Sequence, residues 1–310
     1  MRRLVVKWGH KFSKASITPV TGIVWHVQVG EELFILKRRT DRTTVWAEYD
    51  LMSWLREQGQ PVSVLLFTEQ DAPWAEYEGG IYVLYPYVDG TSGDNLSICD
   101  ENYAYEIGVN LARLHQCLQS YPHTSEFPTF DIFSEVSCWA WPAVKGYLGG
   151  RFQTRLHDLE TQISRNFVMP YEVLPRQLIH RDMHPGNMVF REGKLAAFLD
   201  FDRVRTGVRI FDLCYCSTAV LFTIFTDQTT RQLWPKFVQD LIKSYVMVEP
   251  LTQAEGLAFL YMCYLIQFLF IWYQLDFGNN QLADLNGAML LWIHDQHSVL
   301  EPLIQRSISL

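Results

Sequence analysis

The sequence predicts an α+β fold, with a small β-rich N-terminal part followed by a larger, mostly helical part. Two observations support this division. Apolar, strand-like runs alternate with turn residues up to about residue 90, and from Ala104 onward apolar residues recur at spacings of three and four. A chain of 310 residues is long enough to form two lobes. We therefore expect an N-terminal lobe over residues 1–90 and a C-terminal lobe over residues 91–310.

Composition and charge limit the class of protein. Hydrophobic residues make up 48% of the chain, charged residues 19%, and the net charge is −8. Such a composition is typical of globular proteins, and the negative charge argues against a nucleic-acid-binding protein, which would present a basic surface. The cysteines form no Cys-x-x-Cys pair, and the start lacks the apolar run of a signal peptide. We expect a cytoplasmic protein without a nucleic-acid or membrane partner, and the sequence leaves the oligomeric state open.

The N-terminal elements can be placed from turn residues and periodicity. The runs ITPVTGIVWHVQV and EELFILKRR are strand-like and are joined at Gly30. A helix is expected over residues 44–58, because Gly59 is a natural stop. The apolar runs SVLLF and GIYVLYPYV predict two further strands.

The C-terminal part reads as helical except for one segment described below. An amphipathic helix enters through Asp100 and continues to Leu118. The twenty residues from Gly256 to Leu275 carry no formal charge and are long enough to span a bilayer. Polar side chains occur along this whole run, however, and no lysine or arginine flanks it closely. We therefore expect a buried helix there.

The segment LIHRDMHPGNMVFREGKLAAFLDFDR, residues 178–203, concentrates polar side chains among apolar ones. Asp182 is followed five residues later by Asn187, and a strand-like run ends at Asp200. A Glu192-Gly193 turn predicts a hairpin with Asn187 and Asp200 at its two ends. Phosphoryl transfer needs a carboxylate to take the proton of the acceptor hydroxyl, and oxygen ligands for Mg²⁺. Asp182 is the candidate catalytic base, and Asn187 and Asp200 are the candidate metal ligands.

These residues resemble the motifs of a known family. His180-Arg181-Asp182 with Asn187, followed by Asp200-Phe201-Asp202, is similar to the motifs of the aminoglycoside phosphotransferase and choline kinase family, a small-molecule branch of the protein-kinase fold. The resemblance implies a protein-kinase-like two-lobe fold, a nucleotide-binding N-terminal lobe, ATP or GTP as phosphate donor, and Mg²⁺. It also implies a small hydroxylated acceptor, which in this family can be an aminoglycoside, an aminoalcohol, homoserine or a sugar.

The resemblance extends to the N-terminal lobe. It implies that Lys37, on the same strand face as Ile35, is the phosphate-binding lysine, although a solvated lysine is the alternative. Glu48 lies on the apolar face of the expected helix, so its carboxylate is expected to pair with Lys37, unless it is exposed. The loop TPVTGIVWHV carries the single glycine Gly22 where kinases have several, and the contact of this loop with the phosphates is therefore open.

The run YVLYPYVDG is the expected hinge between the lobes. There the carbonyl of Pro86 would accept from the adenine amine and the N–H of Val88 would donate to the ring, although a strand that simply leaves the sheet is the alternative.

His115 is expected to be a core histidine, and Asp212 resembles the structural aspartate that accepts bonds from the catalytic-loop backbone. His184 is interpreted as loop packing because no second ligand lies at metal spacing.

The acceptor pocket is expected among the C-terminal helices. Their aromatic and acidic candidates are Trp139, Trp141, Tyr264, Trp272 and Asp276, most of which are expected to belong to the core. The aspartates around Asp182 predict an acidic rim that favours neutral or cationic acceptors.

Two other functions compete with this one. A protein kinase is the first, but only nine residues separate Asp202 from Asp212, which is too few for an activation segment. A non-catalytic nucleotide-binding module is the second. It would have no need for Lys37, Glu48, Asp182, Asn187 and Asp200 together.

Overall fold

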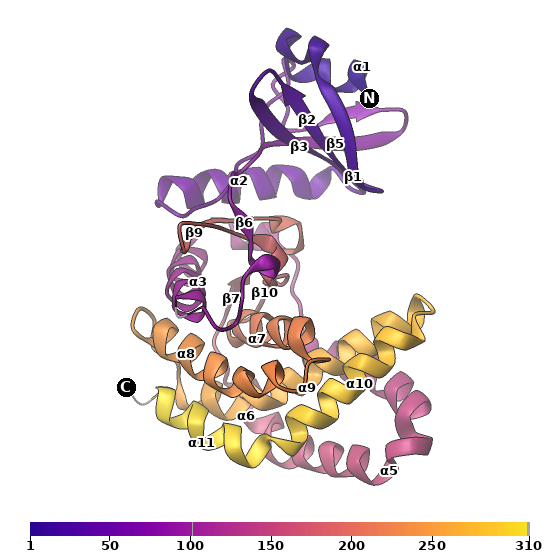
Figure 1. The fold of residues 1–310 in the computed structure, drawn as a ribbon, viewed down its shortest axis with the longest axis vertical. Helices are drawn as coiled ribbons and strands as arrows, with labels where there is room; N and C mark the ends of the chain where they lie inside the picture. The colour runs from indigo at the N-terminus through magenta and orange to yellow at the C-terminus, as the bar shows by residue number, and fades with distance from the viewer. Residues whose placement is uncertain (101, 309–310) are drawn as a thin grey trace.

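The computed structural model describes residues 1–100 and 102–308. An antiparallel sheet from the N-terminal part lies at one end of the molecule and a group of helices at the other (Figure 1). This arrangement confirms the predicted α+β fold. The boundary at residue 90 stays a prediction. The last strand of the sheet ends at Pro86, and the next strand, β6 (Thr91–Ser92), already pairs with a strand of the second part.

The N-terminal sheet has the order β1-β2-β3-β5-β4, with antiparallel neighbours throughout. The short helix α1 (Arg2–Val5) and the turns after it cover one face, where Leu4 and Phe12 pack against Leu36 and Leu84. Gly30 joins β2 to β3 with a φ of 61°, a left-handed conformation that glycine adopts without strain. The strands span Ser16–Thr21 (β1), Val24–Val29 (β2), Glu32–Arg39 (β3), Ala75–Tyr77 (β4) and Gly80–Pro86 (β5).

Two N-terminal expectations need correction. The run at residues 17–29 is divided at Gly22 into the hairpin β1–β2. The run SVLLF is not a strand. Its Leu66 N–H donates to the Leu84 carbonyl at 2.8 Å, but the run has no regular strand structure. Val64 and Leu65 are buried in the same core as helix α2 (Thr43–Glu57). Their apolar character therefore reflects packing in this core and not a place in the sheet.

Short strands in the second part carry the segment at residues 178–203. Strand β8 pairs with β9 through Glu192 and Gly193, both with positive φ, which confirms the predicted hairpin. Strand β7 pairs with β10. The Phe198 N–H donates to the Pro61 carbonyl at 2.8 Å, so the hairpin is tied to the N-terminal part. These strands span Arg176–Ile179 (β7), Met188–Arg191 (β8), Lys194–Phe198 (β9) and Arg205–Val208 (β10).

The remaining chain is helical, and its core lies between α9 and the helices around it. Helix α9 is long and apolar enough to cross a membrane by length and composition, but its apolar window is 83% buried within the protein. The predicted buried helix at residues 256–275 is therefore confirmed, whereas a cytoplasmic location stays a prediction. The helices are α3 (Tyr103–Ser120), α4 (Ile132–Glu135), α5 (Trp141–Asn166), α6 (Val168–Glu172), α7 (Ile210–Ile224), α8 (Trp234–Val246), α9 (Gln253–Asp276), α10 (Asn280–Asp295) and α11 (His297–Ile308).

Candidate active site

The loop after β7 is held in place by one buried carboxylate. Asp212, in the first turn of α7, accepts hydrogen bonds from the backbone N–H groups of His180 at 2.7 Å and Arg181 at 2.8 Å. Arg181 has a φ of 68°, and the two bonds fix the loop in this left-handed conformation. His115 lies 3.2 Å from Asp212 and 2.8 Å from the Tyr245 hydroxyl. The contacts expected of Asp212 and the core position of His115 are confirmed.

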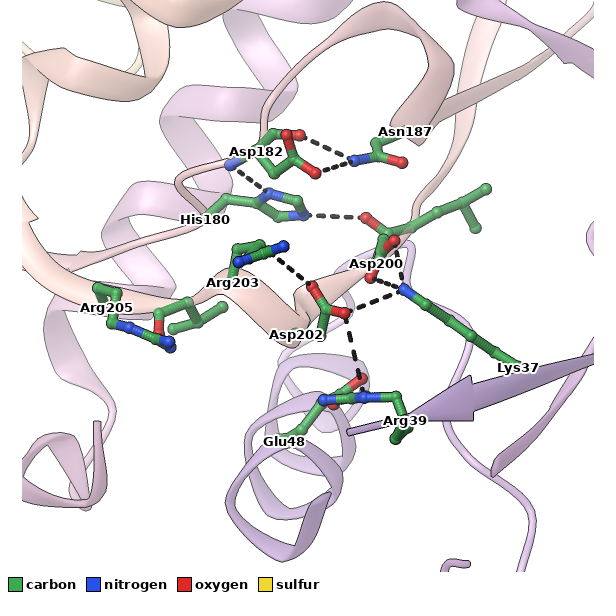
Figure 2. A network of polar contacts seen from close by, with 12 residues as sticks. Lys37, Arg39, Glu48, His180, Asp182, Asn187, Asp200, Asp202, Arg203 and Arg205 are labelled. Carbon is green, nitrogen blue, oxygen red and sulfur yellow. Dashed lines mark hydrogen bonds and ion pairs between the residues drawn. The ribbon is translucent and has the colours of Figure 1, made fainter. Parts of the chain in front are cut away.

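Asp182 is oriented by hydrogen bonds on both carboxylate oxygens. The hydroxyl of Tyr215, on α7, donates to Oδ1 at 2.8 Å, and the side-chain amide of Asn187 donates to Oδ2 at 3.2 Å (Figure 2 shows the Asn187 contact). Asn187 also donates to the Asp182 carbonyl at 2.9 Å. The Asp182 side chain remains 27% exposed, which leaves access for a reacting group.

Asp200 follows β9 and faces Lys37 across the space between the two parts of the chain. The Lys37 ammonium is 2.6 Å from both carboxylate oxygens of Asp200 and 3.0 Å from Oδ2 of Asp202 (Figure 2). Burial raises the pKa of Asp200, but the Lys37 charge outweighs burial and holds this pKa below its usual value. Burial likewise lowers the pKa of Lys37, and the two carboxylates outweigh it, so the pKa of Lys37 is raised.

The expected pair between Lys37 and Glu48 is wrong. Glu48 is buried, as predicted, but its partners are the Arg39 guanidinium and the Tyr85 hydroxyl, which donates at 2.7 Å. Lys37 and Arg39 share one face of β3, and Arg39 is the one opposite Glu48 on α2. Burial raises the pKa of Glu48, although Arg39 acts against the rise. Arg39 also reaches toward Asp202, whose Oδ2 lies 4.0 Å from Nε of Arg39 (Figure 2).

A cavity of about 450 Å³ lies between the sheet and the β8–β9 hairpin, a size suited to a nucleotide. Lys37, Asn187 and Asp200 line it, together with the expected hinge residues Pro86 and Val88. The Pro86 carbonyl already accepts from the Ser63 hydroxyl at 2.9 Å, and a second lone pair remains for a ligand. Gly22 lies in the exposed turn between β1 and β2 and is not among the residues that line this cavity, whereas Val20 and Val24 are. Glu48 does not line it either.

Two further cavities lie beside Asp182 and Tyr215. One, of about 340 Å³, is lined by Asp182, Arg181, Arg203 and side chains of α9. The other, of about 380 Å³, is lined by Asp94, His184 and Gln267 among others. Both are lined by Tyr215, Phe270 and Gln274, so they adjoin along these side chains.

The acceptor side differs from the sequence prediction. None of the five candidates at the C-terminal helices lines these two cavities. Tyr264 is fully buried, as expected of a core residue, whereas Trp139 is 63% exposed. The predicted acidic rim is also wrong for the cavity that contains Asp182, since two arginines share it with one carboxylate. Sequence reasoning missed Tyr215 and the α9 side chains. Tyr215 stands three residues after Asp212 on one helix face, and Ile266, Leu269, Phe270, Tyr273, Gln274 and Phe277 follow helical spacing, so both signals were present in the sequence.

The donor atoms at the nucleotide cavity fit a hard cation such as Mg²⁺. Because the Asn187 amide nitrogen is bound to Asp182, its side-chain oxygen is the atom left to meet a metal. Asp200 supplies a carboxylate to the same cavity. Within residues 1–100 and 102–308 no group of three or more His, Cys, Asp or Glu side chains could hold a metal ion. Asn187 and Asp200 would therefore share a metal with phosphate oxygens, as is usual for Mg²⁺.

Comparison with known proteins agrees with this geometry. A family model described as "Phosphotransferase enzyme family" matches residues 22–255. The chain belongs to this family. A homoserine kinase of Gluconobacter oxydans (strain 621H) is 27% identical over 184 residues, which cover 57% of this chain and 53% of that protein. The chain therefore matches about half the length of this curated relative of the phosphotransferase family.

Solved structures of phosphotransferases share the fold. An aminoglycoside phosphotransferase from Alicyclobacillus acidocaldarius aligns with a TM-score of 0.74 at 11% identity, over 100% of this chain and 96% of that one. An amicoumacin kinase in complex with AMP-PNP and Ca²⁺ aligns with a TM-score of 0.64 at 16% identity, over 93% of this chain and 88% of that one. At these identities the likeness establishes the protein-kinase-like fold of small-molecule phosphotransferases.

Proposed function

We propose that the protein transfers the terminal phosphate of ATP or GTP to a hydroxyl of a small molecule. The hydrogen bond between Asp182 and Asn187 carries this proposal. Asp182 lines the cavity on the acceptor side, and Asn187 lines the nucleotide cavity. The proposed proton acceptor, Asp182, therefore faces the acceptor cavity, and the proposed metal ligand, Asn187, faces the nucleotide cavity. An acceptor hydroxyl and a terminal phosphate would have to meet where these two side chains touch.

Each residue then has a defined task. Asp182 accepts the proton of the attacking hydroxyl, and Tyr215 and Asn187 hold its carboxylate in position. Lys37 binds phosphate oxygens, and Asp212 fixes the catalytic loop. Asn187 and Asp200 hold Mg²⁺, which when bound neutralises charge on the phosphates. Pro86 and Val88 border the adenine site, whereas Gly22 lies in the turn between Val20 and Val24 and has no assigned contact with the phosphates.

The acceptor is a small polar molecule, and its class follows from the cavities and from the relatives. Gln267 is 1% exposed, lines the cavity with Asp94, and its side-chain oxygen has no hydrogen-bond partner within the described chain. A buried amide without a partner is costly unless a ligand completes its bonds. The curated relative above is named as a homoserine kinase, and the solved neighbours act on antibiotics by name. Hydroxylated molecules that also carry nitrogen fit both observations.

The two alternatives gain no support from the structure. The connection from Asp202 to Asp212 is used by the strand β10, which pairs with β7. No length remains there for a platform that binds an extended peptide, so a protein substrate is disfavoured. A module that only binds nucleotide would not need Asp182 held by Tyr215 and Asn187 at the mouth of a second cavity.

A coupled assay of ADP or GDP release tests the proposal. The panel comprises aminoglycosides, aminoalcohols, hydroxylated amino acids and sugars, each with ATP or GTP and Mg²⁺. Asp182→Asn is the inactive control. We expect turnover with at least one small acceptor. Silence across the panel, with phosphorylation of a protein or peptide instead, would refute the proposal.

A further inference from the structure

A group of arginines lies beside Asp182, although the chain as a whole is acidic. Arg181 and Arg203 line the same cavity as Asp182, and Arg205 follows two residues later in β10. Burial and the positive charges of Arg181 and Arg203 lower the pKa of Arg205, although Asp202 and Glu135 act against the fall. A concentration of like charge at a cavity is costly unless an anion balances it.

Three carboxylates lie near these arginines, namely Asp182 in the same cavity, Glu135 and Asp202, and they differ in how closely they hold each guanidinium. Glu135 lies 3.6 Å from the Arg181 guanidinium. Asp202 is the acidic neighbour of Arg203, with Oδ1 3.8 Å from its Nε, but the same carboxylate lies 3.0 Å from Lys37. Asp202 is therefore committed mainly to Lys37, and the Arg203 side chain, 62% exposed, keeps donors for another partner.

Arg181 is already fixed for such a role. Its guanidinium lies over the ring of Phe130, 3.9 Å from the ring centre, and its side chain is 16% exposed. The stack and the contact with Glu135 remove most of its rotational freedom before any ligand arrives. Arg181 therefore contributes a positive charge at a fixed place, and the exposed Arg203 is left for direct contact with a ligand.

The nucleotide is a poor candidate for this partner. The residues that line the nucleotide cavity include neither Arg181 nor Arg203, and the residues that line the cavity with Asp182 include neither Lys37 nor Asp200. Figure 2 shows Arg203 on the opposite side of Asp202 from Lys37. An anion bound by Arg203 would therefore belong to the acceptor.

We infer that the acceptor carries a carboxylate, which Arg203 binds with help from the field of Arg181 and Arg205. The inference rests on the proposed function and narrows it to hydroxylated amino acids. The planar fork of an arginine matches the two oxygens of a carboxylate, whereas a neutral or purely cationic alcohol offers no anion to the exposed Arg203 guanidinium.

Matched pairs of acceptors that differ only in the carboxylate test the inference. L-homoserine is compared with 3-aminopropan-1-ol, L-serine with 2-aminoethanol, and L-threonine with 1-aminopropan-2-ol. The coupled assay gives kcat/KM for both members of each pair with the intact protein, ATP and Mg²⁺. We expect the carboxylated member of the preferred pair to be better by about tenfold or more, the usual worth of a hydrogen bond to a charged group.

Variants of Arg203 assign that difference to one side chain. Arg203→Gln should lower kcat/KM for the carboxylated acceptor about tenfold or more, leave its decarboxylated partner unchanged, and leave the KM for ATP unchanged. Arg203→Lys, which keeps the charge but not the fork, should fall between the two. Arg113→Gln, on the exposed side of α3, is the matched control and should change nothing.

Turnover of any acceptor supports the proposed function, and the preference within the pairs decides the inference separately. Equal or better turnover of the decarboxylated members would overturn the inference while the function stands. An Arg203→Gln effect on the KM for ATP would overturn it too, because the arginine would then bind the nucleotide. If no member is turned over, calorimetric titration of the same pairs onto the protein saturated with AMP-PNP decides. Binding of the carboxylated members no tighter than that of their partners would refute the inference.

Discussion

Arg39 binds the buried carboxylate of Glu48, two residues beyond Lys37 on the same strand. This pairing leaves the Lys37 ammonium to Asp200 and Asp202, which belong to the second part of the chain. The support of helix α2 and the proposed contact with phosphate therefore belong to two different cations, Arg39 and Lys37. Variants of Arg39 and Glu48 should accordingly report on stability.

Arg39→Met should lower the free energy of unfolding by about 3–5 kcal/mol, because it leaves the buried Glu48 without its cation. Urea unfolding measures the loss. Lys11→Met, at an ion pair whose partners are half exposed, is the control and should cost less than about 1 kcal/mol. The double variant Arg39→Met with Glu48→Gln should recover part of the loss, and strictly additive losses would show that the two residues are not coupled.

Asp182→Asn should reduce turnover by about 10²–10⁴-fold and leave nucleotide affinity nearly unchanged, because the amide cannot take the proton of the acceptor. Steady-state kinetics and calorimetric titration with AMP-PNP measure the two quantities. Near-normal turnover in this variant would remove Asp182 from the role of base.

Tyr215→Phe tests how far the orientation of Asp182 matters. The variant removes the hydroxyl that donates to Oδ1 of Asp182 at 2.8 Å and keeps the ring packed between Phe211 and Phe270. We expect kcat to fall about tenfold, with unchanged affinity for nucleotide. A purely structural role for Tyr215 would instead lower the unfolding midpoint and leave kcat as it is.

Asp200→Ala should abolish metal-dependent nucleotide binding, since it removes the carboxylate that lines the nucleotide cavity beside Asn187. Asn187→Ala should weaken it less, because one neutral ligand is lost. Titration of the protein and AMP-PNP with Mg²⁺ compares the two variants. Metal dependence that is unchanged in both would contradict the assignment of these ligands.

The charge of Asp200 should also be visible in the pH dependence of stability. Lys37 holds the pKa of Asp200 below that of the unfolded chain, so the folded state binds this proton less readily. The contribution is present above the unfolded pKa, about 3.9, and is lost as pH falls through the folded pKa. The gap in unfolding free energy between the wild type and Asp200→Asn should therefore stay constant from neutral pH down to about 3.9 and narrow below it. A gap that stays constant below this pH as well would show that no such shift exists.

Local patterns were sufficient for the catalytic loop and its hairpin. The interval between Asp182 and Asn187, the Glu192-Gly193 turn and the position of Asp212 are all set within a few dozen residues of chain. The hairpin follows from short-range geometry, whereas the hydrogen bonds to Asp212 are implied by the resemblance to the phosphotransferase family.

Other features depend on distances that sequence spacing does not give. Lys37 and Arg39 lie on the same strand face, and only the position of α2 along that strand decides which of them meets Glu48. The acceptor cavities depend on how α7 and α9 are rotated about their axes. Residue type favoured large aromatic side chains such as Trp272 as pocket residues, but it is Gln274 that lines both cavities.

A nucleotide that binds in the cavity would have to replace the ion pair between Lys37 and Asp200. Lys37 would exchange the carboxylate for phosphate oxygens, and Asp200 would exchange the ammonium for a metal ion. Nucleotide binding would therefore replace the existing ion pair by two others, and would not simply add new ion pairs. Nucleotide affinity would accordingly follow the difference between the old and new partners. The nucleotide would bind well only together with its metal, because the nucleotide alone would take Lys37 and leave Asp200 without a counter-ion.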